Sequence, residues 1–200
     1  PVITTMNSIK VGSTTKLTNI VTPIIFGTSE KNATILIYHS RNGGPTENIS
    51  TTAANLSGIW TQKVPTTNTG APLPEYQNGD RVTINVVSID IAGNRSATSN
   101  LLSLHIDTLK PVKPTVNIDN TIQTRLTDKV SLSGSAEASP NTFITIHMKD
   151  STGYETTVTT SVDATTGLWS KEIDPVKLKL KSGQYTVTAT QTDEAGNIGS

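Results

Sequence analysis

Two stretches of the chain share one pattern of residues that could bind a metal ion. Asp-x-Ala-Gly-Asn occurs at Asp90–Asn94 and again at Asp193–Asn197. Aspartate supplies carboxylate oxygens, glycine permits a tight turn with positive φ, and asparagine can cap the turn or offer a carbonyl oxygen. Oxygen ligands suit Ca²⁺, which takes about six to eight of them in flexible geometry. The chain has no cysteine to favour a softer metal.

Other landmarks repeat in the same order along the chain. Gly27 and Gly134 open the phrases GTSE and GSAE, and Trp60 and Trp169 end the phrases GIW and GLW. Their spacings are 107 and 109 residues, against 103 for the two motif aspartates. Solenoid repeats are much shorter, about 20 to 50 residues, because each unit relies on its neighbours for a core. The spacing therefore predicts two domains with separate cores.

Short runs of alternating apolar and polar residues predict β-strands in both domains, 1–107 and 108–200. The runs lie at 33–40, 81–89 and 100–106, and at 129–136, 142–149, 155–162, 168–173 and 184–192. Period-two alternation indicates strands with one buried face, and turn sequences such as Asn42-Gly43 separate them. About seven such strands per domain predict an all-β fold of two tandem immunoglobulin-like antiparallel sandwiches. The second sandwich is expected to lack a complete last strand.

Strand direction predicts that acidic residues of the second domain gather at one end. Alternate loops of an antiparallel sandwich share an end, so the loops holding Glu137, Asp163 and Asp193 lie where the chain enters the domain. Asp107 reaches this end from the preceding segment. Like charges so placed would raise each other's pKa unless a cation neutralised them. We expect Ca²⁺ to bind Asp107, Glu137 and Asp193, with Asp163 as a further candidate.

The first domain carries a matching half-site, Glu30 and Asp90. A simpler interpretation stands beside the metal, because Asp and Asn before Gly are common hairpin residues. Asp163, in DATTG, also suits an Asx-turn. Three other acidic residues are expected to be solvated, namely Glu194 and, toward the opposite end, Asp119 and Asp128.

Composition argues against several partners. Lys and Arg number 16, as do Asp and Glu, and the domains are balanced at seven against six and nine against ten. No basic face is available for nucleic acid, and no apolar run approaches the roughly 20 residues of a membrane span. We expect a monomer. The chain begins at Pro1 without a signal peptide, so we also expect it to be an excerpt from a longer array.

Aromatic and histidine residues suggest structure more than chemistry. Trp60 and Trp169 follow Gly at strand starts and are expected in the two cores. His39 and His147 lie at matching strand positions and are expected on the surface, since separate domains cannot share one zinc site. The chain lacks the Gly-x-Ser-x-Gly, phosphate-loop and His-Glu-x-x-His motifs. We expect no enzyme activity.

The second domain resembles the bacterial Ig-like repeats of giant, type I-secreted adhesins and biofilm-associated proteins. The resemblance is carried by DTLKPVKPTV, SLSGSAEASPNTFITI, DATTGLWS and SGQYTVTATQTDEAGNIGS. The first domain departs more, with GTSEKN, NLSGIW and a longer loop before QNGD. The resemblance implies a calcium-rigidified spacer, secreted to a bacterial cell surface. Its partners would be neighbouring repeats, with a host surface or glycan bound through other regions.

Two other functions remain open at this stage. A receptor- or glycan-binding module should display clustered loop aromatics, for which the candidates are Tyr76 and Tyr154. Accessory Ig-like domains of a secreted hydrolase would be distinguished by their flanking sequence.

Overall fold

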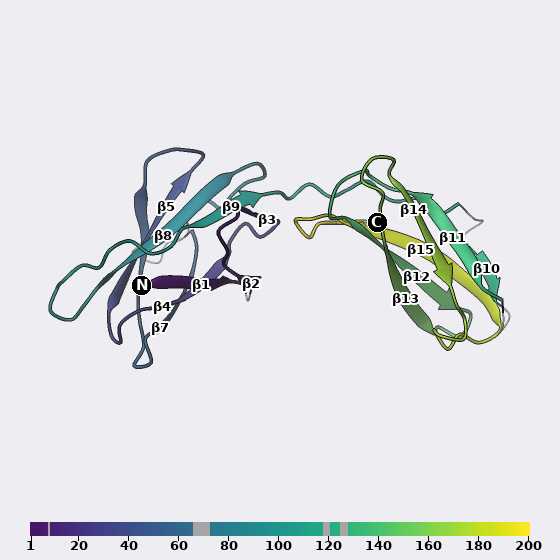
Figure 1. Cartoon of the computed structure of the whole chain (residues 1–200), viewed down its shortest axis with the longest axis horizontal. Helices are drawn as coiled ribbons and strands as arrows, with labels where there is room; N and C mark the ends of the chain where they lie inside the picture. The colour runs from purple at the N-terminus through teal and green to yellow at the C-terminus, as the bar shows by residue number, and fades with distance from the viewer. Residues whose placement is uncertain (8, 66–72, 118–120, 125–127) are drawn as a thin grey trace. The chain divides into compact units, whose positions relative to one another are not determined.

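The protein folds into two compact units, Pro1–Thr108 (unit 1) and Leu109–Ser200 (unit 2). The computed structural model describes residues 1–7, 9–65, 73–117, 121–124 and 128–200. Regular structure in these residues is entirely β-strand, as Figure 1 shows. No helix in the described parts of the chain has the length and apolar character needed to cross a bilayer.

Unit 1 is a sandwich of two sheets. The first has the order β2-β1-β4-β7, from Ile9–Lys10, Val2–Met6, Ile24–Thr28 and Ile59–Lys63. The second has the order β3-β9-β8-β5-β6, from Lys16–Thr18, Leu102–Ile106, Arg81–Ile89, Thr34–Arg41 and Glu47–Ala53. All pairings are antiparallel except that of β3 with β9. Alternate residues of β8, among them Val82, Ile84 and Val86, are buried in the core between the sheets.

Unit 2 repeats this plan with β11 and β14 in one sheet and β12, β13 and β15 in the other. The strands are β11 (Val130–Ser135), β14 (Leu168–Ile173), β12 (Phe143–Asp150), β13 (Glu155–Ser161) and β15 (Gly183–Thr192). Two short strands, β10 (Thr121–Thr124) and β16 (Ile198–Gly199), pair with β15. The entering chain joins the β11 sheet, because Thr115 N donates to Ser135 O over 2.8 Å.

A tyrosine corner marks unit 2 as immunoglobulin-like. The hydroxyl of buried Tyr185, near the start of β15, accepts from Lys181 N over 3.1 Å and lies 3.3 Å from Lys181 O. A tyrosine bonded back to the backbone at this corner is a hallmark of the fold. The predicted fold class, two Ig-like antiparallel sandwiches, is confirmed.

Each core contains one Gly–Trp pair across two neighbouring strands. Gly27 lies opposite Trp60 in the β4–β7 ladder, and Gly134 lies opposite Trp169 in the β11–β14 ladder. Both indoles are buried and lie against their glycines, where a methyl group would overlap the ring. The expected core role of both tryptophans is confirmed, and the two repeated phrases belong to one packing motif.

Candidate functional site

The Asp-x-Ala-Gly-Asn motif forms a self-contained hairpin loop. In unit 2, Asp193 Oδ1 accepts from Asn197 N over 2.8 Å and Oδ2 accepts from Asn197 Nδ2 over 2.9 Å. In unit 1, Asp90 binds the backbone and side-chain nitrogens of Asn94 at 2.8 Å each. The glycine before each asparagine has a φ near 90°, a conformation that glycine adopts readily.

These contacts give the aspartate, the glycine and the asparagine of the motif structural roles. The side-chain and then the backbone hydrogen bond from Asn94 lower the pKa of Asp90, so its carboxylate stays charged. The partner that sequence reasoning did not assign is the asparagine side chain, which grips the second carboxylate oxygen. The motif's spacing is therefore explained by the hairpin alone. If a metal ion bound here, it would be an additional partner of an aspartate that already has hydrogen-bond donors.

Asp163 has a comparable local role. Its Oδ1 accepts from Thr166 N over 2.8 Å, from Thr166 Oγ1 over 2.9 Å and from Thr165 N over 3.0 Å. The bond from Thr166 N is the main reason that the pKa of Asp163 is lowered. This Asx-turn ends at Gly167, which lies against Ala136 O. The contacts favour the turn interpretation of Asp163.

The loop holding Glu137 is fastened to both β15 and the entering chain. Glu137 N donates to Gln191 Oε1 over 2.9 Å, and Gln191 Nε2 donates to Glu137 O over 2.8 Å. Gln191 is 0% exposed, so this pair of bonds is shielded from water. Glu137 Oε2 accepts from Val112 N over 3.1 Å. The loop also meets the Asp163 turn, because Ala136 N donates to Gly167 O over 2.8 Å.

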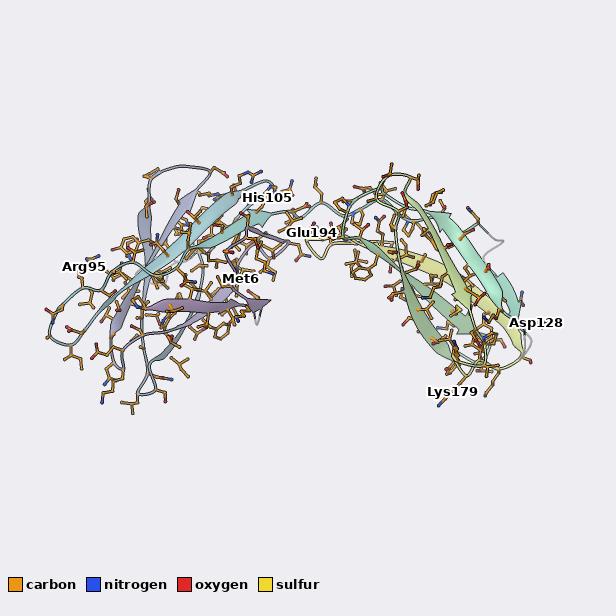
Figure 2. The ribbon with its side chains drawn as sticks, viewed as in Figure 1. Met6, Arg95, His105, Asp128, Lys179 and Glu194 are labelled. Carbon is orange, nitrogen blue, oxygen red and sulfur yellow. The ribbon has the colours of Figure 1, made fainter. Side chains whose placement is uncertain are left out.

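The three loops of unit 2 thus share the end at which the chain enters, but their acids do not form a ready-made cluster. Nowhere in the described residues do three acidic or histidine side chains lie close enough to hold one metal ion. Figure 2 places exposed Glu194 at the entry end of unit 2 and Asp128 at its far end. Asp119 lies outside the described residues.

The remaining candidates belong to unit 1. Asp107 donates its backbone N–H to Thr18 O over 2.9 Å. Glu30 is exposed and its carbonyl accepts from Ala33 N over 3.3 Å. The candidate ligands of both units offer oxygen only, which fits the chemistry of Ca²⁺. Within unit 2, though, Asp193 and Glu137 already accept N–H donors.

Unit 1 also contains a buried charged network that sequence reasoning missed. Asp80 is 5% exposed and forms an ion pair with Arg41, whose Nη2 lies 2.5 Å from its carboxylate. The carboxylate also accepts hydrogen bonds from Gln77 N over 2.6 Å and from Asn42 Nδ2 over 2.7 Å. Burial alone would raise the pKa of Asp80, but these hydrogen bonds together outweigh it and lower the pKa. The sequence predicts turns at Asn42 and at Asp80, but it does not predict that the two turns are hydrogen-bonded to each other.

Tyr76 and His39 extend this network into the core. Tyr76 is fully buried, which corrects its expected place as an exposed loop aromatic, and burial raises its pKa well above the usual range. Its hydroxyl lies 3.1 Å from His39 Nδ1, and the Arg41 guanidinium lies 5.9 Å from the centre of its ring. Burial in turn lowers the pKa of His39.

The two histidines do not occupy matching positions, contrary to the sequence prediction. His39 pairs with Ile84, the inward position that Met148 holds in unit 2, opposite Val187. His147 lies one residue earlier in its strand, and its Nε2 is 3.3 Å from Thr190 Oγ1. A one-residue shift turns a strand side chain to the other face.

Substituting Asp80 by asparagine is expected to remove an acid sensitivity of unit 1. Because the folded pKa lies below the unfolded value of about 4, wild-type Asp80 stabilises the fold above that pH and loses this contribution as pH falls through the folded pKa. Asp80→Asn should cost about 1–3 kcal/mol at pH 7 and flatten the decline below pH 4. Amide exchange followed by NMR reports unit 1 separately. Identical acid profiles for both proteins would contradict the assignment.

The two cores and the strand order define a class of protein, a tandem pair of Ig-like β-sandwiches. No protein-family model matches the chain, and no curated protein matches it. Among solved structures it is similar to the tetra-tandem repeat in the extending region of a large adhesion protein, with 22% identity and a TM-score of 0.36. That match covers 89% of this chain but 43% of the other, so the chain spans less than half of that structure.

A second similar structure is the α-L-rhamnosidase of Streptomyces avermitilis complexed with L-rhamnose. It has 14% identity and a TM-score of 0.31, over 99% of this chain and 22% of the enzyme. Similarities at this level carry no argument about function. The fold assignment rests on the strand pairing and the tyrosine corner described above.

Proposed function

We propose that the chain forms spacer domains of a large bacterial surface adhesin, acting mechanically in cell adhesion or biofilm formation. The observation that carries this proposal is the fastening of the entering chain by the bond from Val112 N to Glu137 Oε2. A loop that binds the segment leading into a domain orders that segment against the domain, as a spacer domain would require. Each unit also has a core of its own, so the chain supplies two separately packed bodies for such a spacer.

The finer part of the proposal is that Ca²⁺ stiffens the joint. Asp107, Glu137 and Asp193 would supply carboxylate oxygens, and the ion would supply the positive charge that permits them to approach. Asp90 and Glu30 would serve the same purpose at the corresponding end of unit 1. These residues belong to polar loops outside the cores, so binding would stiffen the joint without rebuilding either sandwich.

Calcium is expected to stabilise the folded chain more than magnesium does. An ion that binds only the folded state contributes about 2.7 kcal/mol at a hundredfold excess over Kd. Magnesium requires stricter octahedral geometry and keeps its waters, so its effect should be smaller. The measurement is the melting temperature in chelator, Ca²⁺ and Mg²⁺. Equal shifts with the two ions, or no shift, would argue against a calcium site.

Replacing Asp107 by asparagine is expected to abolish the calcium response while leaving both units folded. The substitution keeps the backbone bond to Thr18 and the size of the side chain while it removes the negative charge. Small-angle scattering of the wild type should change between Ca²⁺ and chelator, and that of Asp107→Asn should not. Asp128→Asn, at the far end of unit 2, is the matched control and should behave as wild type. Superimposable wild-type curves in both conditions would refute stiffening by calcium.

Two alternatives receive less support. A glycan- or receptor-binding module would need exposed aromatic clusters, and the described residues offer only Phe143 and Tyr154, which are 42% and 44% exposed, at opposite ends of β12 and the following turn. For accessory domains of a hydrolase, no feature of the described residues provides a specific argument. We propose that the chain itself performs no catalysis.

A further inference from the structure

The two units satisfy their buried tyrosine hydroxyls in different ways. Tyr185 of unit 2 is 1% exposed, and its hydroxyl is bonded to the backbone of Lys181. Tyr76 of unit 1 is 0% exposed, and the polar partner of its hydroxyl among the described residues is His39 Nδ1, at 3.1 Å. A backbone amide does not titrate, whereas a bare imidazole nitrogen changes from acceptor to donor when it takes up a proton. The hydroxyl of Tyr76 therefore depends on a group that titrates near neutral pH, and that of Tyr185 does not.

The geometry selects one tautomer of His39 in the folded protein. A neutral imidazole has one protonated nitrogen, which donates, and one bare nitrogen, which accepts. If Nδ1 carried the proton, it would donate to Tyr76, and the hydroxyl hydrogen would have no acceptor among the described residues. A buried hydroxyl donor without a partner costs free energy, because its hydrogen bond to water is lost. The neutral ring therefore carries its proton on Nε2, and Tyr76 donates its hydroxyl hydrogen to Nδ1.

Charged groups approach His39 from several elements, and the balance disfavours a positive charge on its ring. Burial is the largest cause of the lowered pKa of His39; Glu47, its partner on β6, opposes that effect and Arg41 on β5 adds to it. From the β8 side, Ile84 lies opposite His39, and Asp80, just before the strand, is paired with Arg41. His39 also lines a surface hollow of about 270 Å³, and the lining residues other than His39, Arg41 and Glu47 are uncharged. The hollow gives solvent protons access to the ring.

The turn Tyr76–Asp80 holds the last residues of unit 1, Ile106–Thr108, which we call the exit segment. Gly79 N donates to Ile106 O over 2.8 Å. Thr108 N donates to Asn78 Oδ1, also over 2.8 Å. Because Tyr76 anchors the start of this turn in the core, the bond of its hydroxyl helps to fix the exit segment.

We propose that His39 and Tyr76 form an acid-sensitive latch, which fixes the exit segment of unit 1 at neutral pH and releases it in mild acid. When Nδ1 takes up a proton, the ring becomes a donor to Tyr76, and the hydroxyl hydrogen of the tyrosine loses its acceptor. Arg41 repels the imidazolium as well. The buried hydroxyl donor without a partner favours states in which the turn has left the core. A joint that loosens in acid rests on the proposed spacer function, whereas the latch is a property of unit 1 alone.

The pH window of the latch follows from the lowered pKa of His39. Its contribution to the stability of unit 1 is present above the unfolded pKa of about 6.5 and is lost as pH falls from that value through the folded pKa. In this interval the unfolded chain binds a proton that the folded chain excludes, so the folding equilibrium shifts by up to about tenfold per pH unit. Asp80 acts in a lower window, below about pH 4, so the two acid effects on unit 1 are separable.

The chain contains its own controls for this effect. In unit 2, Met148 takes the inward strand position that His39 has in unit 1, so the corresponding core position does not titrate. The chain has three histidines, and the other two are His105 and His147. His105 lies between two buried residues of β9 and faces outward, and His147 lies beside Thr190 on the outer face of its sheet. Neither of these histidines contacts a buried hydroxyl.

The first experiment follows amide exchange in the complete 200-residue chain by NMR, from about pH 8 to about pH 5, with rates corrected for the intrinsic effect of pH. Protection of the Gly79 and Ile106 amides should fall by up to about tenfold per pH unit below pH 6.5, while protection in unit 2 stays constant. His39→Gln, whose amide oxygen can accept from the tyrosine at every pH, should remove this step. His105→Gln and His147→Gln should keep it. An unchanged step in His39→Gln, or an equal step in unit 2, would overturn the proposal.

The second experiment uses the wild-type chain and so does not depend on how a variant folds. Nitrogen-15 NMR of the histidine rings distinguishes protonated from bare ring nitrogens. At neutral pH His39 should carry its proton on Nε2, and its titration midpoint should lie below 6.5. A proton on Nδ1 at neutral pH, or a midpoint at or above 6.5, would refute the latch. Neither experiment measures the joint between the units, so their outcomes are independent of the calcium scattering test of the spacer function.

Discussion

Replacing Trp169 by alanine is expected to unfold unit 2 or to leave it marginally stable. The indole is 3% exposed and packs in the core against Gly134 of the neighbouring strand. Truncating a buried tryptophan costs about 3–5 kcal/mol, because the lost burial is compounded by the cavity left behind. A domain of this size has a total stability of only about 5–15 kcal/mol.

The chain allows a clean measurement of this effect. It has two tryptophans, one in each core, so Trp169→Ala leaves Trp60 as the single indole and its fluorescence reports urea unfolding of unit 1. That transition should match wild-type unit 1, while amide exchange in unit 2 accelerates by several orders of magnitude. Tyr154→Ala, at an exposed turn, is the control and should have little effect. Wild-type exchange rates in unit 2 of the tryptophan variant would contradict the packing role.

Adding a single methyl group at Gly27 is expected to be almost as damaging to unit 1. An alanine Cβ there would overlap both the Trp60 ring and the Val2 carbonyl oxygen. The ring is enclosed by the core, and β1 is held to β4 by the backbone ladder, so neither neighbour can move aside cheaply. Overpacking of this kind costs about 1–3 kcal/mol and occasionally more. With backbone involved, we expect the upper end of that range.

Gly12 provides the matched control for this substitution. It lies in the same unit, its φ is not positive, and nothing lies within 4 Å of the position that a Cβ would take. Gly12→Ala should therefore be neutral or slightly stabilising, by about 0.4–1 kcal/mol. Urea denaturation followed by Trp60 fluorescence in a Trp169→Phe background compares the two. Equal unfolding midpoints for Gly27→Ala and Gly12→Ala would refute the steric role of the Gly–Trp pair.

Local sequence was sufficient to predict half of the strands in the part of the chain that the structure describes. The eight alternating runs all coincide with strands to within two residues at each end, because period-two burial is a local property of a half-buried strand. Strands with weaker alternation were not predicted. They include β6, whose sequence ENISTTA is largely polar, and the two-residue strands β2 and β16. The tryptophans were also assigned to the core correctly, because each domain has few other large side chains.

Register was beyond the sequence. His39 and His147 align by eye in two similar strands, yet one points toward Tyr76 and the other lies beside Thr190 on the opposite face. The face depends on which residue of β8 or β15 lies opposite, and a shift of one residue reverses it. Nor could the sequence show that β9 pairs with β8 in unit 1 whereas β10 pairs with β15 in unit 2. That choice depends on which segment reaches the edge of each strand in the folded domain.

The acidic residues show the same division. The turn sequences around Asp90, Asp163 and Asp193 identified them as loop residues whose carboxylates have a binding role. This was possible because a short motif determines its own turn. Which donors satisfy them was partly local, as with Asn94 and Asn197, and partly decided by distant chain. Glu137 meets Gln191, and Arg41 meets Asp80, only because antiparallel strands return remote segments to the same end of a sandwich. The sequence by itself determined two Ig-like sandwiches with acidic residues in polar loops. The tertiary structure decided which partners those acidic residues bind, because hydrogen bonds between distant segments form only after the sheets have fixed their register.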